Sequence, residues 1–192
     1  MKTLAAVIIC AFATALAAAP QTPTREQATN ALGKGVRFFR TEVSVQGTYL
    51  WQYSDDLSKR EGEGKATTTQ GWVQPPGTPS VGLAFLSAWQ ATSNTYYLEA
   101  ARETAQALAR GQLLSGGWTY SIDFSDEGRR KLAYRDGGKK TARNFTTFDD
   151  DTTQCALRFL MRTDAALGFR DPKIRDTIDY ALNSILKAQY PN

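Results

Sequence analysis

Histidine is absent from this 192-residue sequence, and cysteine occurs only at Cys10 and Cys155. Without histidine, the chain cannot form a Ser-His-Asp or Cys-His catalytic group or a histidine-ligated metal site. Any metal bound by these residues would have oxygen ligands, which favour calcium, magnesium or manganese over zinc. The sequence therefore excludes a large share of hydrolase and zinc-enzyme chemistry.

Long apolar runs are scarce, and the one that stands out covers residues 4–19, after Met1-Lys2-Thr3. A positive start, a short apolar core and small residues at its end are typical of a secretory signal peptide. The run is too short to span a bilayer comfortably. We expect a signal peptide at residues 1–19, a secreted protein (extracellular or periplasmic), and no membrane segment after cleavage. Cys155 would then have no partner for an internal disulfide, and we expect it to be a small core residue.

The formal charge is +4, and positive side chains gather between residues 128 and 143. Asp136 is the one acidic residue among them. We expect a loop here, and either a solvated surface or a contact surface for a polyanion would explain its composition. The candidate contacts of such a surface are Arg143, Lys139 and Lys140.

Apolar residues recur at helical spacing in five stretches, at about 24–39, 80–91, 95–111, 152–167 and 171–190. Short turns join the second stretch to the third and the fourth to the fifth, which predicts two helix hairpins. Repeated hairpins indicate an all-α fold of the α/α toroid type for residues 20–192. A closed toroid needs more hairpins than these, so we expect the architecture to be truncated at the C-terminus.

Asp149, Asp150 and Asp151 directly precede the apolar positions of the fourth stretch. One interpretation is a helix start, where a carboxylate caps free N–H groups and favours the positive end of the helix dipole. Capping needs one or two carboxylates, and a third repels the others by about 1 kcal/mol even at high dielectric. The other interpretation is a cation site, since calcium binds carboxylate oxygens and would remove that repulsion.

Tryptophan residues offer candidate platforms for sugars. Trp72 opens a proline-rich segment at residues 72–79 that cannot be helical, because proline holds its predecessor in an extended conformation. This segment would line a sugar-binding cleft or cover the next helix. Trp118 follows Gly116-Gly117, whereas Trp89 lies on a helical stripe and is better explained as a core residue.

Three of these features together resemble the family 10 polysaccharide lyases, over about residues 72–192. They are Asp149-Asp150-Asp151-Thr152-Thr153, Gly116-Gly117-Trp118 upstream, and Gln189-Tyr190-Pro191-Asn192 at the end. The family typically shows Asp-Asn-Asp-Ala-Thr at the acidic motif, so Asp149 and Asp151 match while Asp150 and Thr152 depart. The Pro-Lys that usually follows Gly-Gly-Trp is replaced by Thr119-Tyr120.

This resemblance implies an incomplete α/α toroid and a pectate lyase activity, the β-elimination of polygalacturonate. It implies that Ca²⁺, bound by Asp149 and Asp151 with Asp150 beside them, bridges to the substrate carboxylate and acidifies the C5 proton. It also implies sugar contacts from Trp118 and Trp72. The family's base is an arginine that would lie beyond Asn192, so we assign no base and expect this chain alone to be inactive. We expect an acidic polysaccharide partner, no nucleic acid, and a monomer when full-length.

Two other functions fit the same sequence. A secreted, non-catalytic module could bind polygalacturonate through its tryptophans and release no unsaturated ends. A terpenoid cyclase shares the α/α architecture and uses aspartate clusters with magnesium. The cyclase motifs have a different aspartate spacing from Asp149–Asp151, and a secretory signal argues against an intracellular isoprenoid substrate.

Overall fold

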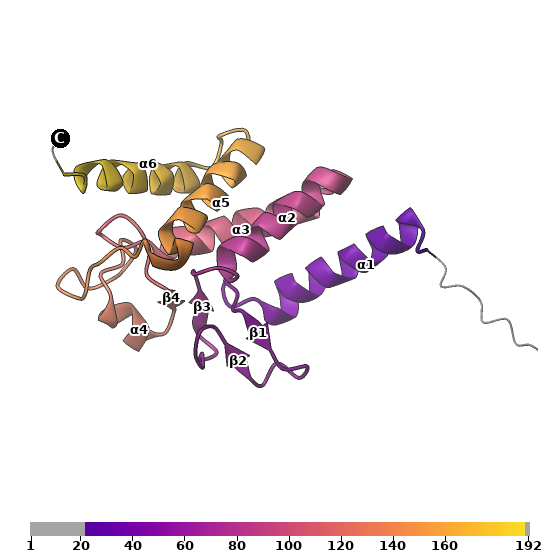
Figure 1. Cartoon of the computed structure of the whole chain (residues 1–192), viewed down its shortest axis with the longest axis horizontal. Coiled ribbons are helices and arrows are strands. Elements are labelled where there is room, and N and C mark those ends of the chain that lie inside the picture. Colours follow the sequence, from indigo (N-terminus) through magenta and orange to yellow (C-terminus); the bar gives the residue numbers. More distant parts are fainter. Residues whose placement is uncertain (1–21, 191–192) are drawn as a thin grey trace, which may run out of the picture.

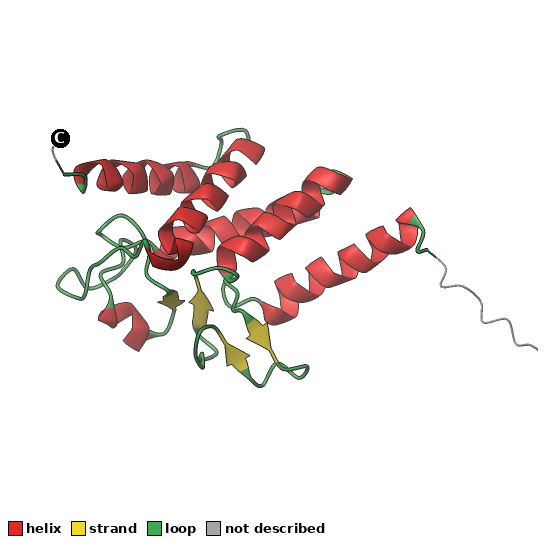
Figure 2. Ribbon diagram, viewed as in Figure 1, coloured by secondary structure: helices red, strands yellow, loops and turns green. Residues whose placement is uncertain are grey.

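The computed structural model describes residues 22–190, and Figures 1 and 2 show how its elements are arranged. In chain order these are α1 (Arg25–Phe38), the π-helical turn η1 (Phe39–Val43), β1 (Gln52–Tyr53), β2 (Arg60–Glu61), β3 (Gln70–Trp72), α2 (Thr78–Thr92), α3 (Thr95–Gly111), β4 (Ser121–Asp123), α4 (Asp126–Lys131), the 3-10 turn η2 (Asp149–Asp151), α5 (Thr152–Ala166) and α6 (Pro172–Lys187).

Helices α2 and α3 form the first predicted hairpin. Ser93 adopts a left-handed conformation (φ 56°) that ends α2, and the Asn94 side chain caps α3 by accepting from the Tyr96 amide at 3.0 Å. Thr95–Gly111 matches the predicted third stretch. Helix α2 begins at Thr78 rather than after Ser80, because Pro79 is well suited to the first helical turn.

Helices α5 and α6 form the second hairpin, also as predicted. Gly168 has φ +63° just after α5, a conformation that costs glycine little. Asp171 caps α6 by accepting from the amides of Lys173 and Ile174 at 3.1 and 3.2 Å. The fold is therefore all-α in class, while the ring arrangement of a toroid stays a prediction.

The core lies between the two hairpins, where α2 and α3 both pack against α5. Gly82 of α2 lets the helices approach closely, since a Cβ there would lie 2.3 Å from the Phe159 ring of α5. Phe159 and Leu108 are fully buried in this core, and Cys155 is buried beside it. The expectation of a structural cysteine is confirmed by this burial.

Helix α1 projects from this core and meets it near its C-terminal end (Figure 1). Its predicted apolar stripe exists, but Val36 is the one buried residue of the helix, and Leu32 is 38% exposed. A guanidinium–carboxylate pair between Arg40 of η1 and Glu103 of α3 ties this end down at 2.5 Å. Most of the stripe thus faces an open apolar groove of about 420 Å³ beside α2.

Two small antiparallel ribbons complete the fold, and the five helical stretches of the sequence do not indicate them. Strand β1 pairs with β2, and β3 pairs with β4 in the register Gln70–Asp123, Gly71–Ile122 and Trp72–Ser121. The basic segment expected to be a loop contains the short helix α4, capped by Ser125. The β3–β4 ribbon brings residues 72–74 beside residues 119–121.

No helix in residues 22–190 is long and apolar enough to cross a membrane. The predicted signal peptide at residues 1–19 lies outside the described residues.

Candidate functional site

The acidic turn, Asp149–Asp151, stands directly before α5 and is exposed. Asp150 and Asp151 have φ values of 48° and 60°, in the left-handed region that non-glycine residues rarely adopt. None of the three carboxylates caps α5, and the Thr153 amide donates instead to the Thr147 carbonyl at 3.2 Å. The helix does start here, with Asp151 at its N-cap position, but the predicted side-chain cap is not formed.

Each carboxylate of the acidic turn has a different partner. Tyr120 Oη donates to Asp149 Oδ2 at 3.3 Å, and Gln74 Nε2 donates to Asp150 Oδ2 at 2.8 Å. Asp151 forms an ion pair with Arg158, about two turns along α5. The turn is thus held from the β3–β4 side and from its own helix at once.

The backbone of residues 72–74 positions these partners. The amides of Val73 and Gln74 both donate to the Tyr120 carbonyl, at 2.7 and 3.3 Å, so the two chain segments stay in register beyond the ribbon. The Gln74 side chain is 5% exposed and also accepts from Trp72 Nε1 at 3.1 Å. A continuous hydrogen-bonded path therefore runs from the Trp72 indole through Gln74 to Asp150.

Electrostatics at this face keep Tyr120 in its protonated form. Loss of solvation raises the pKa of its phenol above the ordinary value, and the negative charge of Asp149 raises the pKa further. Tyr120 is therefore a hydrogen-bond donor at neutral pH. The pKa of Arg158 is also raised, chiefly by its hydrogen bond to Asp151.

The acidic turn meets some requirements of a calcium site. Its potential metal ligands are carboxylate oxygens of exposed residues, and none of them caps α5. Such oxygens suit a hard cation. Among residues 22–190, however, no group of three or more acidic or cysteine side chains is arranged to hold a metal. The three carboxylates predicted as metal ligands do not form one preformed cage, and each has a different partner. Ligation by Asp149 and Asp151 together with a substrate carboxylate stays a prediction.

Trp118 corrects the sequence-based set of sugar contacts. It is 0% exposed, and its Nε1 donates to the Leu108 carbonyl at 2.8 Å inside the core. A fully buried indole has no open face for a sugar, so its predicted binding role is wrong. Trp72 is half-buried, with its ring edge-to-face against Trp51 at 6.2 Å between centroids, and it borders the acidic turn through Gln74.

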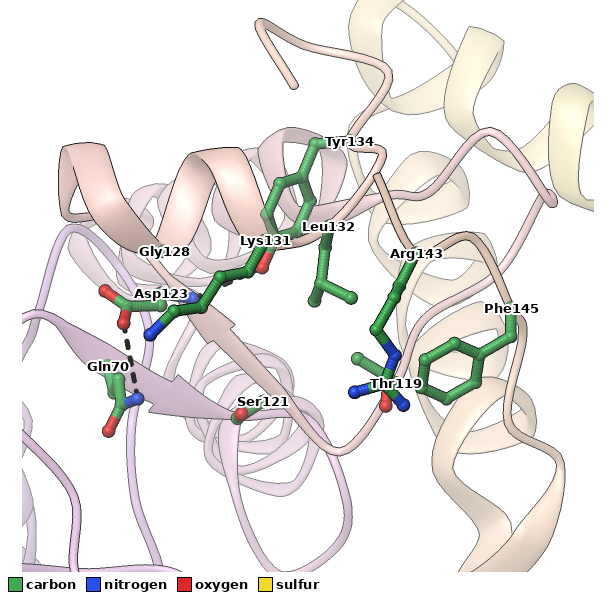
Figure 3. A pocket seen from close by; sticks show the side chains of 10 residues that line it. All are labelled: Gln70, Thr119, Ser121, Asp123, Gly128, Lys131, Leu132, Tyr134, Arg143 and Phe145. Atoms are coloured by element: carbon green, nitrogen blue, oxygen red, sulfur yellow. Dashed lines mark hydrogen bonds between the residues drawn. The ribbon is translucent and has the colours of Figure 1, made fainter. Parts of the chain in front are cut away.

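The predicted basic contacts separate into two groups. Lys139 and Lys140 are exposed on the loop after α4 and line none of the pockets described for residues 22–190. Arg143 instead lines a polar pocket of about 360 Å³ beside the β3–β4 ribbon, with its guanidinium 5.1 Å from the Phe145 ring centroid (Figure 3). Thr119 also lines this pocket and is the chain neighbour of Tyr120, so the pocket adjoins the acidic turn.

Sequence reasoning missed Gln74 and Tyr120 as members of the site. Both lie far from the acidic turn in the sequence, and they reach it only through the β3–β4 ribbon. Each stood inside a segment already noted for another residue: Gln74 follows Trp72 in the proline-rich segment, and Tyr120 follows Gly116-Gly117-Trp118. The sequence therefore pointed to the two segments. Which residue in each segment contacts the acidic turn could not be identified without the pairing of β3 with β4.

Comparisons with known proteins give a distant likeness to one group of solved structures. No protein-family model and no curated protein matches the sequence. The structure of a family 10 polysaccharide lyase from Cellvibrio cellulosa is similar at a TM-score of 0.48 and 18% identity, over 85% of this chain. An aspartate-to-alanine mutant of such an enzyme from the same organism, in complex with trigalacturonic acid, is similar at a TM-score of 0.47 and 19% identity. The chain spans about half the length of these structures, 52% of each.

Proposed function

We propose that this face of the protein binds polygalacturonate with the help of calcium, and that the chain acts as part of a pectate lyase that cleaves the polymer by β-elimination. The observation that carries the proposal is the acidic turn, Asp149–Asp151. Its three exposed carboxylates cap no helix, and two of its residues keep a left-handed backbone.

The backbone of the acidic turn supports a role in ligand binding. A left-handed conformation costs a non-glycine residue roughly 1–2 kcal/mol, and Asp150 and Asp151 adopt it in succession. Such conformations persist where the surroundings fix them, and they gather at ligand and active sites. Here Gln74 and Arg158 fix the two side chains. The chain thus adopts an unfavourable backbone conformation at this turn, and the carboxylate groups of the turn are exposed.

The chemistry of the neighbours suits a polymer of uronate rings. Asp149 and Asp151 supply oxygen ligands, and a calcium ion, when bound, would polarise the substrate carboxylate and make the C5 proton more acidic. Arg158 holds Asp151 in place, and the protonated phenol of Tyr120 can donate to a sugar oxygen. Trp72 offers a half-buried indole at the edge of the same face.

A second candidate function is binding without cleavage. The side chains that contact the acidic turn are Gln74, Tyr120 and Arg158. Gln74 does not titrate, and the pKa values of Tyr120 and Arg158 are both raised, so none of them is suited to abstract a proton at neutral pH. A non-catalytic polygalacturonate-binding module would have this composition.

The test compares Asp151→Asn with the unchanged protein in calcium-dependent binding of polygalacturonate. Asparagine tolerates the left-handed conformation, and exposed ion pairs contribute only about 0–1 kcal/mol, so the free energy of unfolding should change little. Loss of a charged ligand should weaken binding about tenfold or more. Asp179→Asn is the matched control, because Asp179 is exposed on α6 and the same charge is removed far along the chain from the turn.

Ultraviolet absorbance of unsaturated uronate, with and without a chelator, tests for cleavage. Calcium-dependent binding with unsaturated product supports the lyase and rejects the binding module. Calcium-dependent binding without product supports the shared binding role, and it is the result expected both of a binding module and of a lyase part without its base. Equal binding by Asp151→Asn and the unchanged protein, together with a lower melting temperature of the variant, would show that the acidic turn is structural and would reject the proposal.

A further inference from the structure

A second polar site lies on the other side of residues 119–121 from the acidic turn. It is the pocket of about 360 Å³ bounded by the β3–β4 ribbon, α4 and the segment that carries Arg143 (Figure 3). We call it the ribbon pocket. The side chains that matter here are Thr119, Ser121, Asp123, Lys131, Arg143 and Phe145.

We propose that the ribbon pocket binds a single uronate ring, with the ring's carboxylate on Arg143 and its hydroxyl groups toward Asp123. The substrate class rests on the proposed function, whereas the site itself is separate from the acidic turn and needs no metal.

Arg143 is the positive group best placed to receive a carboxylate. In residues 22–190 its guanidinium has no ion pair, and it lies 5.1 Å from the Phe145 ring centroid. Figure 3 shows it directed into the pocket beside Phe145 and Thr119. Contact with an aromatic ring restricts the orientation of the planar guanidinium. The guanidinium can then donate two parallel hydrogen bonds to a carboxylate.

Arg129 and Arg135, two other arginines of this region, are already engaged. Arg129 donates to the Arg110 carbonyl at 2.9 Å and lies over the Tyr134 ring at 4.3 Å. Arg135 pairs with Asp176 of α6 at 3.0 Å and lies over the Tyr180 ring. Both therefore hold the fold together, whereas Arg143 is available to a ligand.

The opposite end of the pocket carries the carboxylate of Asp123. Burial tends to raise the pKa of Asp123, but hydrogen bonds from Ser125, Thr69 and Gln70 outweigh it and hold the pKa below its ordinary value. Its Oδ2 receives only the long bond from Gln70 Nε2, at 3.3 Å, so it can still accept from a sugar hydroxyl. Figure 3 shows Lys131 reaching toward this end, where its ammonium, which also pairs with Glu127 at 2.7 Å, adds a positive charge and a donor.

Two hydroxyl groups lie between the ends. No hydrogen bond joins the side chain of Thr119 or Ser121 to another part of residues 22–190, so each hydroxyl can donate to or accept from a ligand. The pocket thus has a guanidinium at one end, a carboxylate beside a lysine ammonium at the other, and neutral hydroxyl groups between them. A hexuronate has this complementary pattern, with a carboxylate at C6 and hydroxyl groups across the ring.

Size and charge argue against other anions. Pockets for small ligands typically run from about 300 to 1,000 Å³, and this one is near the lower limit, which suits one sugar ring. Free phosphate would satisfy Arg143, but it has no ring hydroxyl groups to meet Asp123, Thr119 and Ser121 at the same time. A neutral sugar would leave the guanidinium of Arg143 without its carboxylate.

The test titrates the full chain with monomeric galacturonate and follows backbone amide shifts by NMR, with a chelator present to remove any contribution from calcium. Amides of residues 119–123 and 143–145 should shift, whereas those of the acidic turn should not. Arg143→Gln should weaken binding at least about tenfold, because charge-assisted hydrogen bonds are lost. Arg130→Gln removes the same charge from α4 outside the pocket and should bind normally. Galactose, which lacks the carboxylate, should bind more weakly than galacturonate.

Arg143→Lys provides a second variant that keeps the charge but loses the two-pronged geometry, and it should fall between the unchanged protein and Arg143→Gln. Equal binding of galacturonate and galactose, or unchanged binding by a folded Arg143→Gln, would overturn the inference. Calcium-dependent polymer binding that needs Asp151, with no galacturonate binding at the ribbon pocket, would overturn this inference and leave the proposed function intact. Galacturonate binding at the pocket without calcium-dependent polymer binding would support the inference and overturn the proposed function.

Discussion

Asp171 joins two helices through one buried carboxylate. Its Oδ1 accepts from the first amides of α6, and its Oδ2 accepts from Arg102 Nε at 2.8 Å and from Gln106 Nε2 at 2.9 Å, both on α3. The side chain is 4% exposed, so these donors replace the water that the charge has lost. Removal of the charge would therefore affect both the start of α6 and its attachment to α3.

The pKa of Asp171 gives the direction of its contribution with pH. Burial tends to raise this pKa, but hydrogen bonds from Arg102, Ile174 and Gln106 outweigh it, so the folded pKa lies below the unfolded value of about 3.9. The stabilisation is then fully present above the unfolded pKa and is lost as the pH falls through the folded pKa. At neutral pH, Asp171→Asn should lower the free energy of unfolding by about 1–3 kcal/mol.

Urea unfolding at neutral pH and near pH 3 would measure this effect. The difference between Asp171→Asn and the unchanged protein should shrink at the lower pH, because protonation removes the same charge. A difference that stays constant with pH would show that the substitution acts through packing. Asp179→Asn on the exposed side of α6 is the control for charge alone.

The tryptophans show what residue type alone can and cannot indicate about a site. Trp72 opens a proline-rich segment and Trp118 follows two glycines. The sequence predicts a sugar contact for both. The structure buries Trp118 completely, whereas it leaves Trp72 half-buried beside Gln74. Which face of an indole is covered depends on distant segments, so the acidic turn could be located from the sequence but its neighbours could not.

Helix hairpins are the part of the fold that the sequence predicts well, because their signals are local. The turns at Ser93-Asn94 and at Gly168, and the cap at Asp171, are where the residue types predict them. The β3–β4 ribbon escaped prediction, because each strand has only three residues and the partners are about fifty residues apart. Strands this short show no period, and their pairing is fixed by the helices that bring their ends together.

Contact between α2 and α5 can be tested through Gly82. A Cβ added there would lie 2.3 Å from the ring of Phe159, and that ring is 0% exposed and has no room to move. Gly82→Ala should therefore lower the free energy of unfolding by about 1–3 kcal/mol, the usual effect of overpacking.

Gly35 of α1 provides the matched control for this substitution. Its added Cβ would meet nothing within 4 Å, so Gly35→Ala should raise the free energy of unfolding by about 0.5–1 kcal/mol through helix propensity. Denaturant titrations of both variants would measure the contrast. Equal effects of the two substitutions would contradict the packing described between α2 and α5.

At the scale of the whole molecule, apolar side chains lie exposed at both ends of the helical layer. Phe38 of α1 is 45% exposed and Leu186 of α6 is 64% exposed, and Figure 1 shows these two helices on opposite sides. Burial of one such side chain is worth about 1.5–3 kcal/mol, a sizeable fraction of the ~5–15 kcal/mol that stabilises a typical domain. We expect this chain to self-associate as its concentration rises.

Sedimentation velocity over a range of concentrations would measure that association. Leu186→Glu should shift the distribution toward the monomer, whereas Asn183→Glu, which adds the same charge to an exposed polar position of α6, should change it less. A monomer at every concentration would show that the exposed residues are too dispersed to act as a surface.

The sparse packing of helix α1 has a further consequence, which concerns the rate at which its backbone amides exchange hydrogen with solvent. Its start is secured by the reciprocal bonds of Thr24 and Gln27 and its end by Val36, but the turns between them bury no side chain. A helix of 14 residues is marginal in water without tertiary contacts. We therefore expect α1 to unwind and reform many times while the two hairpins stay folded, so that deuterium replaces the amide protons of residues 28–34 long before those of α3.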